Sequence, residues 1–252
     1  MLSKNLIKLV RSLEMKKFRK ETGLFVAEGE KLVNDLISSG VESFKIIATE
    51  KHAAALRNNR DIELVVVDDE ELKKVSFLKS PQGIVGLFKQ KNCAPDVATP
   101  RRELCLALDD VQDPGNLGTI IRIADWFGIE HIYCSIGTVD VYNPKTVQAT
   151  MGAISRVNIY YVDLPQFLSS MEKSIPVYGT FLDGKNIYDH KLSANGVIVM
   201  GNEGKGIGSE CEKFVDERIL IPNYPAGRAT SESLNVSTAT AIVCGEFRRR
   251  CL

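Results

Sequence analysis

Three stretches of the chain place polar side chains where an apolar strand passes through a turn into a helix. They are LALDDVQDPGNLGTIIRIADWFG (106–128), GVIVMGNEGKGIG (196–208) and the run from Ile221-Pro222 to Asn235-Val236-Ser237. Amides, hydroxyls, a carboxylate and a guanidinium in such turns can orient a ligand and handle its protons. One such turn could be accidental, whereas three of the same design indicate a site.

In the first stretch the informative polar residues are Asn116 and Arg122. Asn116 could cap the helix that follows the turn, and Arg122 falls off the apolar stripe of that helix. The stripe consists of Ile120, Ile121, Ala124 and Phe127. Taken alone, an ordinary cap and a surface pair between Arg122 and Asp125 would explain both residues.

The second stretch, Gly201-Asn202-Glu203-Gly204-Lys205-Gly206-Ile207-Gly208, suits a ligand that approaches the main chain closely, because glycine has no Cβ. Its spacing is neither G-x-G-x-x-G nor G-x-x-x-x-G-K-[ST], so dinucleotide-binding and P-loop interpretations are weakly supported. A purely structural turn would account for the glycines but not for Glu203.

The third stretch crowds Ser231, Ser233 and Asn235 at the start of the last helix. The later residues of that helix that we expect to be buried are Ala239, Ile242, Val243 and Phe247. A single polar residue would suffice as a helix cap. The surplus therefore indicates contact with a ligand.

Short β-branched runs alternate with amphipathic helical stretches, which is typical of an α/β fold with largely parallel sheets. The runs are 44–49, 63–67, 83–88, 104–108, 131–134, 157–162, 176–181, 196–200 and 217–221. Segment 90–102 is polar, holds two prolines and has no periodicity, as a linker would. We therefore predict a first domain over 1–90, a linker over 91–102 and a second domain over 103–252.

Composition bounds the class of protein without naming a function. The 252 residues are 44% hydrophobic and 25% charged, which fits one large or two ordinary soluble domains. Since 32 basic residues balance 32 acidic ones, the molecule as a whole does not attract a polyanion.

Basic residues are nevertheless concentrated at both ends. Residues 1–20 carry seven basic side chains and one acidic one, and the chain closes on Arg248-Arg249-Arg250. These could hold phosphates. A solvated helix face and a basic helix end are the simpler interpretation. The apolar side of that first helix would be Leu2, Leu6, Leu9 and Leu13.

The six cysteines are scattered without a C-x-x-C pair, so they suggest neither zinc nor a disulfide framework. The N-terminal segment has charges every few residues, and the longest apolar stretches are only as long as strands. We expect a cytoplasmic protein without a membrane span.

In this order, the three stretches resemble the three motifs of the SpoU (TrmH-like) branch of the SPOUT RNA methyltransferases. DVYNPKTVQATMGAISRVNI (140–159) also resembles that branch. LFVAEGEKLVNDLISSG (24–40) is similar to the L30e-like substrate-binding domain that often precedes it. The resemblance implies an α/β fold with a deep C-terminal trefoil knot, which composition could never show because knots are nearly absent from proteins.

The resemblance further implies methyl transfer from S-adenosylmethionine to a ribose 2′-hydroxyl of ribosomal or transfer RNA, within a homodimer and without a metal. Residue by residue, it assigns catalytic roles to Asn116 and Arg122 of the first motif, Glu203 of the second, and Ser233 and Asn235 of the third. It assigns cofactor binding to the backbone of Gly201, Ile221 and Leu234. Such a transfer mainly requires that a hydroxyl be positioned and its proton removed.

The arginine of the first motif is the base proposed for the family, but a guanidinium with a pKa above about 12 hardly deprotonates in proteins. We expect Arg122 to hold the RNA phosphate beside the target ribose. The proton would pass to that phosphate or to a water oriented by Asn116 and Glu203. The loop over 223–233 is longer than is usual in this family, and Arg228 at its tip could contact RNA.

Two other interpretations stay open at this stage. A catalytically silent RNA-binding relative could keep the fold, but it would not need all five polar groups. An unrelated nucleotide-dependent α/β enzyme could use the glycine loops for a phosphorylated cofactor, but the chain lacks the dinucleotide fingerprint and its ribose-binding acid.

Overall fold

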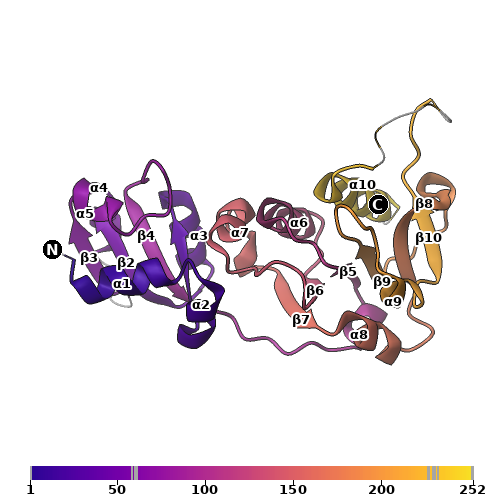
Figure 1. The fold of residues 1–252 in the computed structure, drawn as a ribbon, viewed down its shortest axis with the longest axis horizontal. Coiled ribbons are helices and arrows are strands. Elements are labelled where there is room, and N and C mark those ends of the chain that lie inside the picture. The colour runs from indigo at the N-terminus through magenta and orange to yellow at the C-terminus, as the bar shows by residue number, and fades with distance from the viewer. Residues whose placement is uncertain are drawn as a thin grey trace. The chain divides into compact units, whose positions relative to one another are not determined.

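The computed structural model describes residues 2–250, apart from 58, 60–61, 226–227, 229–230 and 232. By their contacts the residues fall into two compact units (Figure 1). The first unit combines the chain up to Asn92 with Asp140–Arg156, and the second combines Cys93–Val139 with the chain from Val157 onward. Segment 140–156 thus joins the first unit, although it follows the predicted linker by some 40 positions. The domain boundaries proposed above stay a prediction.

The first unit is built on a mixed four-stranded sheet in the order β1-β4-β2-β3. Strand β4 is antiparallel to β1 and β2, whereas β2 and β3 are parallel. The strands are β1 (Leu24–Glu28), β2 (Ser43–Thr49), β3 (Leu64–Val67) and β4 (Ile84–Lys89). The helices are α1 (Lys4–Ser12), α2 (Lys16–Thr22), α3 (Glu30–Ser38), α4 (Glu50–Leu56), α5 (Asp69–Lys73), α7 (Pro144–Thr150) and the 3-10 turn η2 (Ala153–Ser155).

The basic N-terminal segment forms two helices rather than one, because the chain turns between Ser12 and Lys16. The predicted apolar side is present: Leu2 and Leu13 are buried in the core of the first unit, and Leu6 and Leu9 are partly buried against it. Most of the basic side chains of this segment are exposed.

Arg19 is the exception, since only 2% of it is exposed. Its guanidinium donates to the Asp140 carboxylate from Nε at 2.9 Å and from Nη2 at 2.6 Å. It also donates to the carbonyl oxygens of Leu13 and Glu14. Arg19 therefore joins α2 to segment 140–156 and is not available to a phosphate.

The second unit holds a six-stranded sheet in the order β10-β8-β9-β5-β6-β7, in which every pairing is parallel. The strands are β5 (Leu104–Leu108), β6 (His131–Ser135), β7 (Asn158–Val162), β8 (Val177–Asn186), β9 (Gly196–Met200) and β10 (Glu217–Leu220). The helices are α6 (Pro114–Trp126), α8 (Leu164–Ser170), α9 (Ser209–Glu212) and α10 (Val236–Arg249), with 3-10 turns η1 (Thr99–Arg101) and η3 (Ile187–Asp189). The predicted α/β alternation is confirmed.

Helices α6 and α10 lie side by side in this unit (Figure 1). Near the end of α10, Arg248 donates from Nε to the carbonyl of Phe127 at 2.7 Å and from Nη2 to that of Gly128 at 2.8 Å. Both carbonyls lie just beyond the end of α6. Arg248 therefore ties the C-terminal ends of the two helices together.

The other two arginines at the end of α10 bind a buried carboxylate of the same helix. Arg249 and Arg250 donate to Glu246, which is only 5% exposed. The hydrogen bond from Arg249 is the main cause that lowers the pKa of Glu246 to about 2, against the opposing effect of burial. The three arginines thus bind groups of the protein near the end of α10. None of the described helices is long and apolar enough to cross a bilayer.

Candidate active site

Two neighbouring strands end at one edge of the second sheet and carry two of the three polar stretches. Strands β5 and β9 pair in parallel with Leu108 opposite Met200, so their carboxyl ends coincide. From β5 the sheet continues through β6 and β7 on one side, whereas β8 and β10 lie beyond β9 on the other. The strand order therefore reverses between β5 and β9. In open α/β sheets, ligands bind outside the carboxyl ends of strands at such a point.

Helix α6 begins at this edge with Asp113 as its N-cap, because the Asp113 carboxylate accepts the backbone N–H of Asn116 at 2.8 Å. The expectation that Asn116 caps the helix is wrong. Pro114 fits the first helical position, where no N–H is needed. The cap is therefore the residue directly before Pro114, which is Asp113. Asn116 lies in the first turn instead, with its side-chain amide available to other groups.

The loop after β9 closes on itself through Asn202. The backbones of Asn202 and Gly206 exchange hydrogen bonds of 2.9 and 3.0 Å, and Asn202 Nδ2 donates to the carbonyl of Asp110 at 2.7 Å. A Cβ on Gly201 would lie 2.2 Å from the carbonyl carbon of Gly206. Glycine at position 201 is therefore required by the closure of the loop itself.

Glu203 projects from this loop to the start of α6. Its Oε1 accepts Asn116 Nδ2 at 2.9 Å and the N–H of Asp113 at 3.3 Å, and its Oε2 accepts the N–H of Gln112 at 3.4 Å. Partial burial acts to raise the pKa of Glu203, but the hydrogen bond from Asn116 and those from the backbone outweigh it and lower the pKa. The carboxyl is thus ionised at neutral pH and fixes the loop after β9 against α6.

The third stretch reaches the same point through Asn235, the N-cap of α10. Its Oδ1 accepts the N–H of Ser237 at 3.0 Å and that of Thr238 at 3.3 Å. Its Nδ2 donates to Asn116 Oδ1 at 2.9 Å. A single polar residue does cap this helix, and the same residue also contacts the first stretch.

Asn235, Asn116 and Glu203 form a continuous hydrogen-bonded chain, which we call the polar chain. Its direction is set at both ends, because backbone N–H groups of α10 can only donate and an ionised carboxylate can only accept. A carboxylate offers about four lone-pair positions. Gln112, Asp113 and Asn116 donate to the carboxylate of Glu203, and its own backbone N–H adds to them, while the residue stays exposed to solvent.

Arg122 does not join the polar chain. It lies on α6 six positions after Asn116, which places it about 240° further around the helix. Its side chain is exposed, and within the described part of the structure it has no ion-pair partner. It therefore faces away from the amides of the polar chain.

The remaining predicted residues lie in the loops around this edge. Ile221 follows β10 and is half-buried, whereas Ser233 is exposed and Leu234 is 49% exposed. Arg228 is also exposed. The predicted long loop over 223–233 falls partly outside the described residues, which lack 226–227, 229–230 and 232.

Asp110, which is not among the predicted site residues, organises the turn after β5. Its φ is 60°, in the left-handed region that few residues other than glycine adopt, although aspartate tolerates it. Its N–H donates to Ser135 Oγ at 2.8 Å, and its carbonyl accepts Asn202 Nδ2. Asp110 thus joins the ends of β5, β6 and β9. The available signal was an acidic pair directly after a buried strand.

Two parts of the chain match families of known proteins. Residues 103–245 match the model of the SpoU rRNA Methylase family, and residues 4–86 match that of the MRM3-like substrate binding domain. The chain is 30% identical over 240 residues to 23S rRNA (guanosine(2553)-2′-O)-methyltransferase RlmP of Bacillus subtilis, with 94% of each chain covered.

Two solved structures extend the similarity to the whole fold. One is a TrmH-family protein of Porphyromonas gingivalis, with 39% identity, 99% of each chain covered and a TM-score of 0.89. The other is an AdoMet-bound rRNA methyltransferase of Sinorhizobium meliloti, with 31% identity, 100% of this chain and 97% of that one covered, and a TM-score of 0.85. The predicted fold class, a SPOUT-type α/β domain after a small α/β domain, is confirmed. The chain belongs to the SpoU rRNA methylase family of RNA methyltransferases.

Proposed function

We propose that the protein methylates a ribose 2′-hydroxyl of ribosomal RNA with S-adenosylmethionine. The matched family is named for rRNA methylation, and the similar B. subtilis protein is named as a guanosine 2′-O-methyltransferase of 23S rRNA. The polar chain of Asn235, Asn116 and Glu203 carries the proposal. Its aligned amides and single ionised acceptor, at the carboxyl edge of β5 and β9, can orient a hydroxyl for attack.

When bound, S-adenosylmethionine supplies a methyl group on a positively charged sulfonium that an oxygen nucleophile can displace in line. The residues at this edge fit such a molecule. The ionised Glu203 suits a cation, and the exposed Leu234 offers an apolar surface to an adenine ring. We assign the adenosine part to the backbone of Gly201, Ile221 and Leu234. A Cβ on Gly206 would meet nothing within 4 Å, so the outer part of the loop borders open space.

Within the polar chain, Glu203 is an ionised hydrogen-bond acceptor, and its lowered pKa makes it a weaker base than an ordinary carboxylate but a stronger one than water. The exposed side of its carboxylate holds a water beside the attacking hydroxyl in one orientation. As the new bond from oxygen to carbon forms, the hydroxyl proton passes through that water to the carboxylate of Glu203. Asn235 keeps the amide of Asn116 directed at Glu203 throughout.

Arg122 and Ser233 act on the RNA rather than within the polar chain. The exposed guanidinium of Arg122 is always ionised and can bind a phosphate with two parallel hydrogen bonds. The exposed hydroxyl of Ser233, two residues before Asn235, is close enough along the chain to contact the same nucleotide.

The working form in this proposal is a homodimer formed through the second unit. Large apolar side chains are exposed there, including Trp126 at the end of α6, which is 85% exposed, and Leu182, which is 73% exposed. Exposed apolar groups of this size often mark interfaces. A single monomeric species in light scattering at micromolar concentration would contradict the dimer.

Calorimetric titration with S-adenosylhomocysteine, the expected product, tests the cofactor assignment without knowledge of the RNA target. Saturable binding is expected, weakened in Leu234→Ala and unchanged in Val97→Ala, a matched truncation of another exposed apolar residue of the second unit. Substitution of Gly201 is a poor test, because a Cβ would collide with Gly206 whether or not a ligand binds. Absence of binding in folded protein would favour the catalytically silent RNA-binding interpretation.

A further inference from the structure

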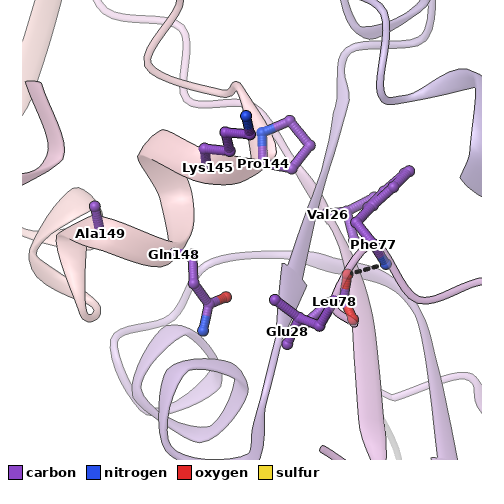
Figure 2. A pocket seen from close by; sticks show the side chains of 8 residues that line it. All are labelled: Val26, Glu28, Phe77, Leu78, Pro144, Lys145, Gln148 and Ala149. Atoms are coloured by element: carbon purple, nitrogen blue, oxygen red, sulfur yellow. Dashed lines mark hydrogen bonds between the residues drawn. The ribbon is translucent and has the colours of Figure 1, made fainter. Parts of the chain in front are cut away.

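The first unit contains a cavity of about 350 Å³ between strand β1, the segment after α5 and helix α7 (Figure 2). None of its lining residues belongs to the polar chain. The volume is within the range of roughly 300–1,000 Å³ that is usual for pockets that bind small organic groups. Its apolar walls are formed by Val26, Phe77, Leu78 and Pro144.

Glu28 provides the buried polar group of this cavity, with only 4% of its surface exposed. One carboxylate oxygen accepts the hydroxyl of Ser76 and the other accepts the N–H of Phe77 at 2.6 Å. Burial raises the pKa of Glu28, although these two hydrogen bonds oppose that effect. The backbone N–H of Leu78 is a third and weaker donor, so the carboxylate keeps about one lone-pair position for a further donor.

Helix α7 supplies two more polar groups to the cavity. The half-buried Gln148 extends from α7 toward β1, the strand that carries Glu28 (Figure 2). Lys145 is exposed on the same helix and also lines the cavity. The β1 wall falls within the match to the substrate-binding domain, whereas α7 falls within the match to the methylase family.

We propose that this cavity receives one unstacked base of the RNA substrate, a base that carries an exocyclic amino group. The proposal rests on the proposed function, since it requires an RNA substrate. The ring of Phe77 and the neighbouring apolar walls cover the faces of the base, and Glu28 accepts an N–H of the amino group. The Gln148 amide pairs with the remaining edge, and Lys145 binds an adjacent phosphate.

The polar groups favour a base over an apolar peptide side chain as the occupant. An aliphatic side chain would leave the remaining acceptor position of Glu28 and the Gln148 amide without partners in a partly dehydrated space, which is unfavourable. A base with an exocyclic amino group can donate to Glu28 and pair its remaining edge with the Gln148 amide. The ammonium of Lys145 suits the phosphate that accompanies every base.

Fluorescence anisotropy with labelled RNA hexamers of cytidine, adenosine or uridine tests the proposal. Wild-type protein should bind the cytidine or the adenosine hexamer roughly tenfold more tightly than the uridine hexamer, because uracil has no exocyclic amine. Gln148→Ala should abolish this preference, and Ala149→Phe should do the same by filling the cavity. Ala55→Phe, on the exposed face of α4 in the same unit, should keep it. Lys145→Ala should weaken all three hexamers equally.

Equal affinity of the wild-type protein for the three hexamers would overturn the proposal. So would an unchanged preference in Gln148→Ala or Ala149→Phe, which is the result expected if a peptide occupies the cavity. Titration of the same preparations with S-adenosylhomocysteine separates this proposal from the proposed function. Variants that bind the product normally but lose base preference report on the cavity alone, whereas wild-type protein that fails to bind the product argues against the function.

Discussion

Glu203 and Glu28 are two carboxylates that the protein treats in opposite ways. Glu203 is exposed and accepts three hydrogen bonds, and its pKa is lowered. Glu28 is almost fully buried, and its desolvation outweighs the hydrogen bonds from Ser76, Phe77 and Leu78, so its pKa is raised. The balance between desolvation and the number of donors decides the direction in each case. The candidate site therefore holds a carboxylate that stays ionised at neutral pH, whereas the cavity of the first unit holds a carboxyl that protonates more easily.

The largest expected effect is on methylation in Asn116→Asp, which replaces the central amide of the polar chain by a second carboxylate facing Glu203. It cannot donate to Glu203 and repels it, so we expect the methylation rate to fall by at least about a hundredfold. The cap of α6 should survive, since Asp113 accepts the backbone N–H of residue 116. The rate is measured by transfer of labelled methyl to ribosomal RNA, with Asn5→Asp on α1 as control. A fully active variant would refute the role of the polar chain.

The next effect is on stability, in Glu28→Ala. The hydroxyl of Ser76 and the N–H of Phe77 would lose their acceptor, and the free energy of unfolding should fall by about 1–3 kcal/mol. Glu21→Ala, at an exposed position of the same unit, should cost less than about 1 kcal/mol. Hydrogen exchange at the Phe77 amide measures the loss locally. Fluorescence of the single tryptophan, Trp126, would not report on it, because Trp126 lies in the second unit. Equal losses in both variants would mean that Glu28 is not structurally important.

A smaller effect is expected in Arg122→Lys, because Arg122 lies outside the polar chain. Lysine keeps the charge but loses the paired hydrogen bonds to a phosphate, so kcat/KM for RNA should fall roughly tenfold. Affinity for S-adenosylhomocysteine should not change. Arg102→Lys, another exposed arginine of the second unit, serves as the control. Full turnover in Arg122→Lys would exclude the phosphate clamp.

The smallest effect is a pair of opposite pH dependences. Because the pKa of Glu203 is lowered from its usual 4.5, its contribution to stability is present above pH 4.5 and is lost as the pH falls through the lowered value. The pKa of Glu28 is raised from 4.5, so its contribution is present below that pH and is lost as the pH rises through the raised value. Urea unfolding between pH 3 and 7 should therefore show the cost of Glu203→Gln shrinking toward acid and that of Glu28→Gln shrinking toward neutral pH. Parallel curves would contradict the comparison of the two carboxylates.

Most strands of the second sheet were well predicted because buried parallel strands are continuous apolar runs, whereas β8 continues to Asn186, beyond the predicted run 176–181. The predictions for β5 and β9 agree with the structure at both ends. Strand β1 was not predicted, since Leu24–Glu28 is short and only Gly29 separates it from the amphipathic residues of α3. Sequence periodicity also gave no reason to place segment 140–156 with the first unit. That placement depends on contacts such as the pair between Arg19 and Asp140, which are 121 positions apart.

The residue types of the site were predictable, but their partners were not. Asn116, Glu203 and Asn235 stood out as polar groups at strand-to-helix turns, and their catalytic roles came from the resemblance to the SpoU branch. The hydrogen bonds that join them span 87 and 119 positions, and no local pattern encodes such distances. Asn116 was predicted as the cap, but aspartate caps helices as well as asparagine does, and Asp113, directly before Pro114, takes that position. The same limit applies to Asp110, whose role follows from the three strand ends that it joins.

Helices α6 and α10 are fastened to each other at both ends. Asn235 contacts Asn116 where the helices begin, and Arg248 contacts the carbonyls of Phe127 and Gly128 where they finish. A slip of one helix along the other by a single residue, about 1.5 Å, would break both fastenings at once. The contacts at the two ends therefore fix the register of α6 against α10, and with it the spacing between the amides of Asn116 and Asn235. A substitution at Arg248, more than a dozen residues from the polar chain, would therefore loosen the register of the two helices and change the distance between Asn116 and Asn235.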